Sequence, residues 1–309
     1  MGEGRGMKTK NRKVTRLLST LVAGFALLAV AERAEAQEIQ LTGPLAGAPA
    51  VRKLRLYREG RFEIAPAVSF SLLDEYQRTI FLGARLTYNF TDWLGFGAWG
   101  AYGGLIQLPT HLTEQIQEVN EDRQAAAAQV PPGDPPPLNT RLTAVNMGPD
   151  FEEQLGGIDW VVAPQITVVP FRGKLALFSS IYVDTDLYAF GGPAIIGLTE
   201  RADCGPESDN ANVACADPNT GFDTASRVAI APTFGIGLTF YLNKWSAIGF
   251  EGRLMPFSIN TGGFDTAGGG KDQKFPDNNI TDADRRFTLG QMLTLSYNIY
   301  LPTKYRVSE

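Results

Sequence analysis

The stretch from Arg227 to Ile259 constrains the fold more than any other, because its side chains alternate strictly between two kinds. In the first half, apolar residues occupy every second position and small or polar residues fill the gaps. The apolar set is Val228, Ile230, Pro232, Phe234, Ile236, Leu238, Phe240 and Leu242. A period of two places each set on its own face of a β-strand. The run exceeds the roughly five or six residues of a typical soluble strand and suits the roughly nine to eleven tilted residues that cross a bilayer. We therefore predict two membrane-spanning strands joined by a turn at Asn243–Trp245.

The first 36 residues have the pattern of a secretory signal peptide. A basic segment ends at Arg16, an apolar core runs from Leu17 to Ala31, and residues 34–36 fit an A-x-A cleavage site. The core is short for a transmembrane helix; a signal anchor is the alternative interpretation. Cleavage would remove seven basic and three acidic side chains and leave a formal charge of −9. An acidic chain is not expected to bind nucleic acid, which requires clustered Lys and Arg.

The two cysteines, Cys204 and Cys215, lie in one loop-like stretch of the exported chain. Oxidation is permitted in such compartments, so we predict a local disulfide between them. Free or metal-binding thiols are the alternative.

The alternation recurs along the chain and divides it into about eight strands. We assign residues 1–36 to the signal peptide, 37–60 to a periplasmic lead-in, 61–302 to a barrel and 303–309 to a C-terminal tail. Short turns are expected at Asn89–Trp93, Pro170–Lys174 and Asn243–Trp245. Long loops are expected at Leu105–Gly157, Gly191–Ser226 and Asn260–Asp284, the first with a short helix near Leu112–Ala128. An even strand number places both ends on the short-turn side, which is periplasmic in bacterial barrels.

A sheet that crosses lipid must close, because an open edge leaves backbone groups without partners. The prediction is an all-β chain: an eight-stranded antiparallel transmembrane β-barrel with long extracellular loops, in the cell outer membrane. A secreted or periplasmic β-sandwich, whose inner faces also alternate, is the alternative.

Aromatic residues near the predicted strand ends fit the two girdles of such a barrel. We assign Phe90, Trp93, Phe171, Tyr241, Trp245, Tyr297 and Tyr300 to the periplasmic girdle, and Trp160 to the outer one with Tyr102, Phe257 and Phe287.

Three groups of residues carry a resemblance to a known family. They are the turn Tyr88–Gly95, the pair of segments Pro164–Ile166 and Pro170–Ala176, and the end of the last predicted strand, Ile299–Pro302. With them, most of residues 60–302 resembles the outer membrane β-barrel domain proteins of myxobacteria and related Gram-negative bacteria, small OmpA-like barrels. The resemblance implies a monomeric barrel, and some relatives are thought to serve in gliding-motility envelope complexes. The chain departs from many such barrels because it continues past its last strand as Pro302–Glu309.

Charged residues on the inward faces predict the content of the lumen. An eight-stranded barrel is just wide enough to be filled by side chains, and buried charges are costly unless they are paired. We therefore expect a lumen charge network that plugs the barrel, formed by Glu63, Arg85, Glu251 and Arg253, with Asp184 and Asp186 towards a rim. A selective polar path for ions is the alternative.

Other polar residues are better explained as solvated surface than as sites. His111, the only histidine, has no serine placed beside it for nucleophilic catalysis. The Asp/Asn runs at 209–210 and 277–284 lack the spacing of a calcium loop. The basic patch Arg52–Arg55 reads as a linker, with lipid headgroups or peptidoglycan-side partners as the alternative. We expect no catalytic residue, no metal and no cofactor.

The predicted function is a structural or docking role in the cell envelope. The expected partners are outer-membrane lipid and lipopolysaccharide, and envelope proteins reached through the outer loops or residues 37–60. The first alternative is a narrow pore for ions or small solutes, and the second is a membrane-embedded lipid-modifying enzyme.

Overall fold

The computed structural model describes residues 58–131, 147–148, 150–177, 181–203, 222–267 and 280–303, and for residues 174–177, 181–182, 203 and 222–223 the backbone alone. Eight strands follow one another along the chain. They are β1 (Arg61–Leu72), β2 (Gln77–Asn89), β3 (Leu94–Pro109), β4 (Gly157–Leu177), β5 (Ile181–Asp203), β6 (Phe222–Tyr241), β7 (Ser246–Ile259) and β8 (Arg286–Leu301). Helix α2 (His111–Ala128) follows β3, and a 3-10 turn, η3 (Asp282–Asp284), precedes β8.

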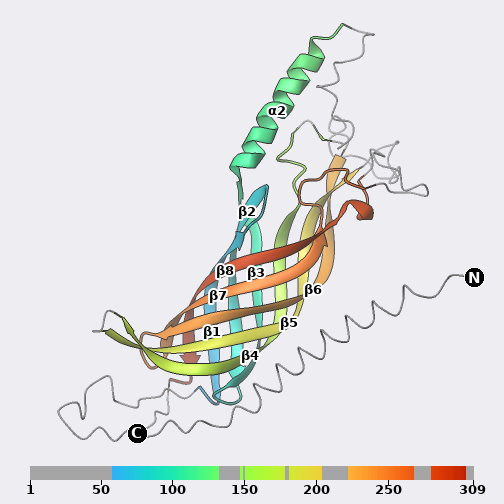
Figure 1. Ribbon diagram of the computed structural model, residues 1–309. Coiled ribbons are helices and arrows are strands. Elements are labelled where there is room, and N and C mark those ends of the chain that lie inside the picture. Colours follow the sequence, from blue (N-terminus) through green and yellow to red (C-terminus); the bar gives the residue numbers. More distant parts are fainter. Residues whose placement is uncertain are drawn as a thin grey trace, which may run out of the picture. The chain divides into compact units, whose positions relative to one another are not determined.

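Every strand pairs antiparallel with its neighbours in the sequence, and β1 also pairs with β8, from Phe62 opposite Leu301 to Leu72 opposite Gln291. The sheet is therefore a closed barrel, as Figure 1 shows. Closure gives each edge strand a partner, which removes the exposed backbone groups that an open sheet would present. The predicted eight-stranded antiparallel barrel is confirmed.

The two-residue period of the sequence becomes the inside and outside of the barrel. In β1 the buried side chains alternate with exposed ones, so Glu63 and Ala65 face inward while Phe62, Ile64 and Val68 face outward. The outer surface is consequently apolar over most strands: Ile236, for example, is 65% exposed. Large exposed apolar surfaces on a folded protein mark a partner or a membrane.

One end of the barrel holds the beginning of β1 and the end of β8, together with the connections at residues 90–93, 178–180 and 242–245. We call it the turn end. The opposite end holds the connections at residues 73–76, 110–156, 204–221 and 260–285, and we call it the loop end.

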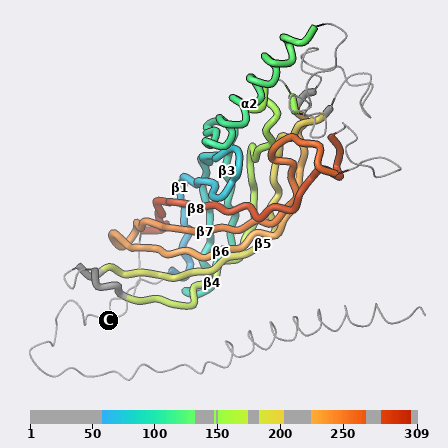
Figure 2. The backbone as a smooth tube through the Cα atoms, turned by 45° about the horizontal axis from the view of Figure 1, so that its top comes forward, coloured from blue at the N-terminus to red at the C-terminus, as the bar shows by residue number. Residues whose placement is uncertain are grey.

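The predicted turn at Pro170–Lys174 is wrong, because these residues belong to β4. The register between β4 and β5 shifts between Val168 and Phe171, which accommodates Pro170 as a bulge where no ladder hydrogen bond is required of it. Pairing then resumes and continues to Leu177 opposite Ile181. β4 and β5 therefore extend at the turn end as a two-stranded ribbon (Figure 2).

The predicted loop at Gly191–Ser226 is also partly wrong, and so is the predicted start of the loop at Leu105. β5 continues to Asp203, β6 begins at Phe222, and β3 runs on to Pro109. The glycines and prolines of this region suggested a loop, but Ala194, Ile196 and Leu198 keep the alternation and are buried. Packing inside the barrel therefore overrides the local turn signal.

The ladder between β6 and β7 is short. It runs from Tyr241 opposite Ala247 only to Phe234 opposite Leu254, whereas β7 stays paired with β8 as far as Ile259 opposite Arg286. Towards the loop end, a side chain bridges the two strands: the Arg227 guanidinium of β6 donates a 2.8 Å hydrogen bond to the Ser258 carbonyl of β7. We call this part of the wall, residues 227–233 and 255–259, the β6–β7 seam.

Helix α2 begins directly after β3 and is anchored to the turn between β1 and β2. The Thr110 amide and the Thr113 hydroxyl both donate to the Tyr76 carbonyl, at 2.9 and 2.5 Å. The helix predicted near Leu112–Ala128 is thus present at His111–Ala128. Among the described residues, no helix combines the length and apolar character needed to span a membrane.

Candidate functional site

The lumen is the feature of the fold that decides what the barrel can do. Towards the turn end it is lined by charged side chains. Arg85 of β2 lies 2.7 Å from Glu63 of β1 and forms an ion pair with Glu251 of β7, and Arg253 lies 2.6 Å from Glu251. All four side chains are at most 5% exposed. The structure therefore brings the four predicted lumen charges into one chain of ion pairs.

Arg58 completes this network and was missed by the sequence analysis. It precedes β1, in a segment without alternation, yet its guanidinium is buried and lies 2.5 Å from Glu63 and 3.5 Å from Asp186. The Asp92 carboxylate accepts hydrogen bonds from the Arg58 and Glu59 amides, at 2.7 and 3.1 Å, and fixes the chain there. No sequence pattern signals this arrangement, because it depends on the turn between β2 and β3 meeting the chain before β1.

In the most deeply buried part of the network, Arg58, Arg85 and Arg253 are matched by Glu63, Glu251 and Asp186. The less buried Arg172 adds a second partner to Asp186, at 4.0 Å. Such pairing is what makes burial tolerable, since each unpaired charge would carry a large desolvation cost.

Tyr188 of β5 braces the network from the opposite wall. Arg85 donates a 2.8 Å hydrogen bond to the Tyr188 hydroxyl, which in turn donates to Glu251 at 3.2 Å. The Tyr188 ring occupies the space that a side chain at Gly237 would need. Gly237 of β6 lies directly opposite Tyr188 in the β5–β6 ladder and therefore makes room for the aromatic ring.

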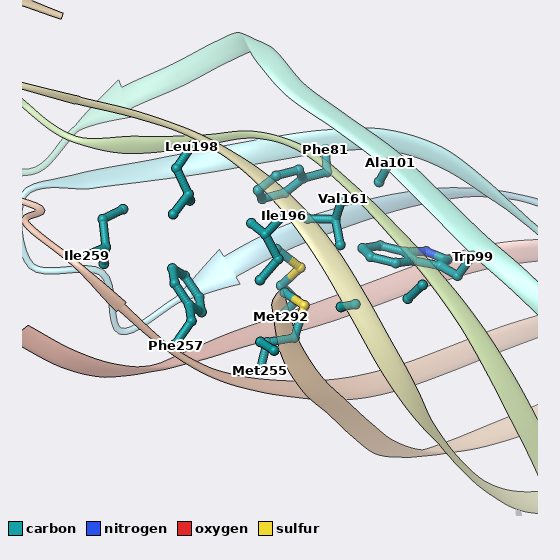
Figure 3. Close-up of a cluster of buried hydrophobic side chains, with 13 residues drawn as sticks. Phe81, Trp99, Ala101, Val161, Ile196, Leu198, Met255, Phe257, Ile259 and Met292 are labelled. Atoms are coloured by element: carbon teal, nitrogen blue, oxygen red, sulfur yellow. The ribbon is translucent and has the colours of Figure 1, made fainter. Parts of the chain in front are cut away.

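Towards the loop end the lumen is filled by an apolar cluster, which we call the apolar layer (Figure 3). Its members come from β2 to β8 and are at most 9% exposed: Phe81, Trp99, Ala101, Val161, Ala163, Ala194, Ile196, Leu198, Ala231, Met255, Phe257, Ile259 and Met292. Packed apolar side chains leave little space for water. The apolar layer therefore fills the lumen on the loop-end side of the charged network.

Above the apolar layer, segments from two loops lie across the loop end. Glu200 pairs with Arg227 at 2.7 Å and with Arg285 at 2.9 Å. The Gln154 amide donates to the Gly262 carbonyl at 2.7 Å and accepts from Arg201 at 2.9 Å. These bonds hold residues 150–156 and 260–267 together at the loop end.

Not all residues assigned to the predicted aromatic girdle face outward. Phe90, Trp93, Phe171, Trp245 and Tyr297 are exposed on the outer surface at 40–66%, and Trp160 is half-buried. Tyr241 and Tyr300 are corrections, because they face the lumen. The Tyr241 hydroxyl donates to Asp186 at 2.7 Å, and Tyr300 is fully buried beneath Arg58 and Arg61. The physical reason is that successive side chains of a strand point to opposite faces. Each of these two tyrosines lies an odd number of positions after a residue that faces outward, so its own side chain faces the lumen. Phe257, assigned to the outer rim, is likewise inside, in the apolar layer.

The remaining candidates do not assemble a site. His111 is 81% exposed on α2 and pairs with Glu114. Asp284 accepts hydrogen bonds from the Thr266, Ala267 and Thr281 amides and so acts as a cap. No cluster of potential metal ligands occurs within the part of the chain that the structure describes. Cys204 and Cys215, the Arg52–Arg55 patch, the segments at 1–36, 37–57 and 304–309, and the Asp/Asn runs at 209–210 and 277–279 lie outside the described residues.

The fold and its filled interior define the class of protein: a closed eight-stranded antiparallel β-barrel with an apolar outer surface. No protein-family model and no curated protein match the chain. Among solved structures, the N-terminal β-barrel domain of Pseudomonas aeruginosa OprF is 8% identical, with a TM-score of 0.37 over 79% of this chain and 98% of that one. OprG from the same organism is 10% identical, with a TM-score of 0.32 over 79% and 96%. Ail of Yersinia pestis is 12% identical, with a TM-score of 0.28 over 79% and 99%. At these values the assignment of the fold rests on the strand ladders of this chain.

Proposed function

We propose that this chain is a small integral outer-membrane barrel with a structural or docking role in the cell envelope, and that it does not conduct. The observation that carries the proposal is the two-layered filling of the lumen, a buried ion-pair network beneath a packed apolar layer. An interior filled in this way has no continuous polar path. What the protein offers to partners is then its surface and its loops.

The outer surface supports a membrane location. Exposed apolar side chains cover the wall, and Phe90, Trp93, Trp245 and Tyr297 lie near the turn end. Aromatic side chains favour the boundary between lipid and water. We propose that lipid and lipopolysaccharide surround the barrel, that the turn end faces the periplasm and the long loops the exterior, and that the barrel acts as a monomer, with a gliding-motility or other envelope complex as its setting.

Single-channel recording tests the proposal. The purified chain, reconstituted in a planar bilayer, is expected to give no steady unit conductance. Retarded electrophoretic migration on unheated samples verifies that the barrel is folded, and a porin of known conductance verifies the bilayer. A steady unit conductance from the folded wild-type barrel would sink the closed-barrel proposal in favour of the narrow pore.

The orientation has its own test. Protease added to whole cells is expected to cleave within residues 110–156 and to spare the turn at residues 90–93. Cleavage restricted to the turn would invert the orientation.

A further inference from the structure

The segment between β3 and β4 carries most of the net negative charge of the predicted mature chain. Residues 110–156 hold eight Asp or Glu and two Arg, a formal charge of −6, whereas the chain without residues 1–36 has a formal charge of −9. All other residues of the mature chain together therefore have a formal charge of only −3. In the described part, Glu118, Glu121 and Asp122 of α2 are exposed, as are Glu152 and Glu153 in the segment that returns along the helix.

This acidic surface encloses an apolar groove. α2 presents Leu112, Ile116 and Val119, spaced so that they lie on one face of the helix. Leu112 is 44% and Val119 57% exposed. Met147 lines the groove with Ile116 and Val119, and the groove has a volume of about 270 Å³.

The groove is built by specific hydrogen bonds. The Asn120 amide donates to the Gly148 carbonyl at 2.9 Å and so holds Met147 beside the helix. The Phe151 amide donates to Gln117 at 2.8 Å one turn earlier. Phe151 is fully buried and stacks on Phe264, with ring centroids 5.4 Å apart. The groove is thus preformed, which reduces the entropy that a partner must lose on binding.

We infer that α2, residues 147–148 and residues 150–154 form a docking surface for a cationic, amphipathic polypeptide segment. An apolar groove on a helix accepts side chains spaced along one face of a partner helix. The acidic rim would attract Lys and Arg that flank those side chains, and it would repel competing acidic surfaces.

The charge also argues against the other occupants of such a surface. Anionic lipid headgroups would be repelled by a segment with a formal charge of −6. The exposed carboxylates are not gathered as metal ligands within the described residues. A polypeptide that supplies both cations and apolar side chains satisfies both features of the surface. This inference rests on the proposed docking role and names the chemistry of the partner.

The test uses the full chain in phosphatidylcholine nanodiscs and fluorescent fourteen-residue peptides. The first peptide carries Leu at one helical face and Lys elsewhere. A second replaces Lys by Glu, and a third replaces Leu by Ser. Empty nanodiscs measure binding to lipid, which is subtracted. The Leu/Lys peptide is expected to bind at least about tenfold more tightly than either control peptide.

Two substitutions separate the groove from the charge. Val119→Asp removes an apolar side chain from the groove and makes the surface more acidic. Glu118→Lys leaves the groove apolar and reduces the negative charge of its rim. Each is expected to raise the Kd of the Leu/Lys peptide about tenfold. Glu59→Lys makes the same charge change at the turn end and is expected to leave the Kd unchanged.

Equal or tighter binding to Val119→Asp, or equal binding of the Ser/Lys peptide, would overturn the inference, because charge alone would then suffice. Val119→Ala provides a milder variant, and circular dichroism reports whether the helix persists. Conductance of the same preparation is recorded in parallel. If the barrel conducts and binds the peptide, the closed-lumen proposal is wrong and the docking surface stands. If the barrel does not conduct and does not bind the peptide, the docking surface is wrong and the closed lumen stands.

Discussion

The guanidinium carbon of Arg253 lies 4.1 Å from the centre of the Trp99 ring. This contact joins the two fillings of the lumen, since Arg253 also pairs with Glu251 at 2.6 Å while Trp99 belongs to the apolar layer. Arg253 further donates to Gln165 at 2.9 Å and lies over the ring of Phe190. A cation placed on an aromatic face is stabilised by the ring quadrupole. The charged network therefore meets the apolar layer at an arginine that has both a carboxylate and an aromatic partner.

Replacing Arg85 by Met tests the ion-pair network. The change leaves Glu63 with Arg58 and Glu251 with Arg253, each short of one partner. Loss of one member of a buried pair typically costs about 3–5 kcal/mol. The free energy of unfolding, measured by urea titration with tryptophan fluorescence, is expected to fall by that amount. The matched change Arg78→Met, at an exposed position of β2 near the loop end, is expected to cost less than about 0.5 kcal/mol. Equal effects at the two positions would show that the network does not stabilise the barrel.

Trp99→Ala tests the apolar layer. The side chain is 1% exposed, so its removal leaves a cavity and also strips Arg253 of one of its two aromatic contacts. The expected cost is about 3–5 kcal/mol in the free energy of unfolding. Trp93→Ala, at a position 57% exposed, is the control and is expected to cost clearly less in the same urea titration.

Gly237→Val tests the space reserved for Tyr188. A Cβ at Gly237 would collide with the Tyr188 ring, which is fixed by Arg85 and Glu251. Overpacking of this kind typically costs about 1–3 kcal/mol. Gly252→Val is the matched control on β7, because no heavy atom lies within 4 Å of a Cβ there. The prediction fails if both variants fold with the same urea midpoint.

Arg227→Met tests the β6–β7 seam. The variant loses the bond to the Ser258 carbonyl and the 2.7 Å pair with Glu200. Hydrogen exchange measured by mass spectrometry is expected to rise in residues 227–233 and 255–259, because local opening follows the loss of local contacts. Residues 234–241, which pair with β7, are expected to keep their protection. A uniform increase over β6 would contradict this account of the seam.

Asp74→Asn tests a half-buried carboxyl in the connection between β1 and β2. Burial raises the pKa of Asp74, against the opposing effects of the Ser71 hydrogen bond and the Arg78 charge. A raised pKa means that the folded state holds the proton more tightly than the unfolded state, so stability falls as pH rises from the ordinary value of 3.8 through the folded value. The variant is expected to be more stable than wild type at pH 7, with the difference shrinking as the pH approaches 3.8. Glu118→Gln, which removes the charge of an exposed carboxylate, is the control. The prediction is contradicted if the wild type is more stable than Asp74→Asn at pH 7.

The period of two predicted the number and pairing of strands because it is a local property of the sequence. Glu63, Arg85, Glu251 and Arg253 could be assigned to the lumen for the same reason, since parity alone puts them opposite the apolar face. The same parity, applied to Tyr241 and Tyr300, would have placed them inside. Their assignment to the girdle followed residue type instead of position.

What the sequence by itself determined was therefore the alternation of Arg227–Ile259 and its repeats, and with it the closed barrel and the charged inner face. The tertiary structure alone decided which charges meet, that Arg58 enters from outside the strands, and that Pro170 is a bulge. It also decided that the region after Gly191 packs as strand. These features depend on contacts between residues far apart in the chain, where packing and desolvation outweigh local preference.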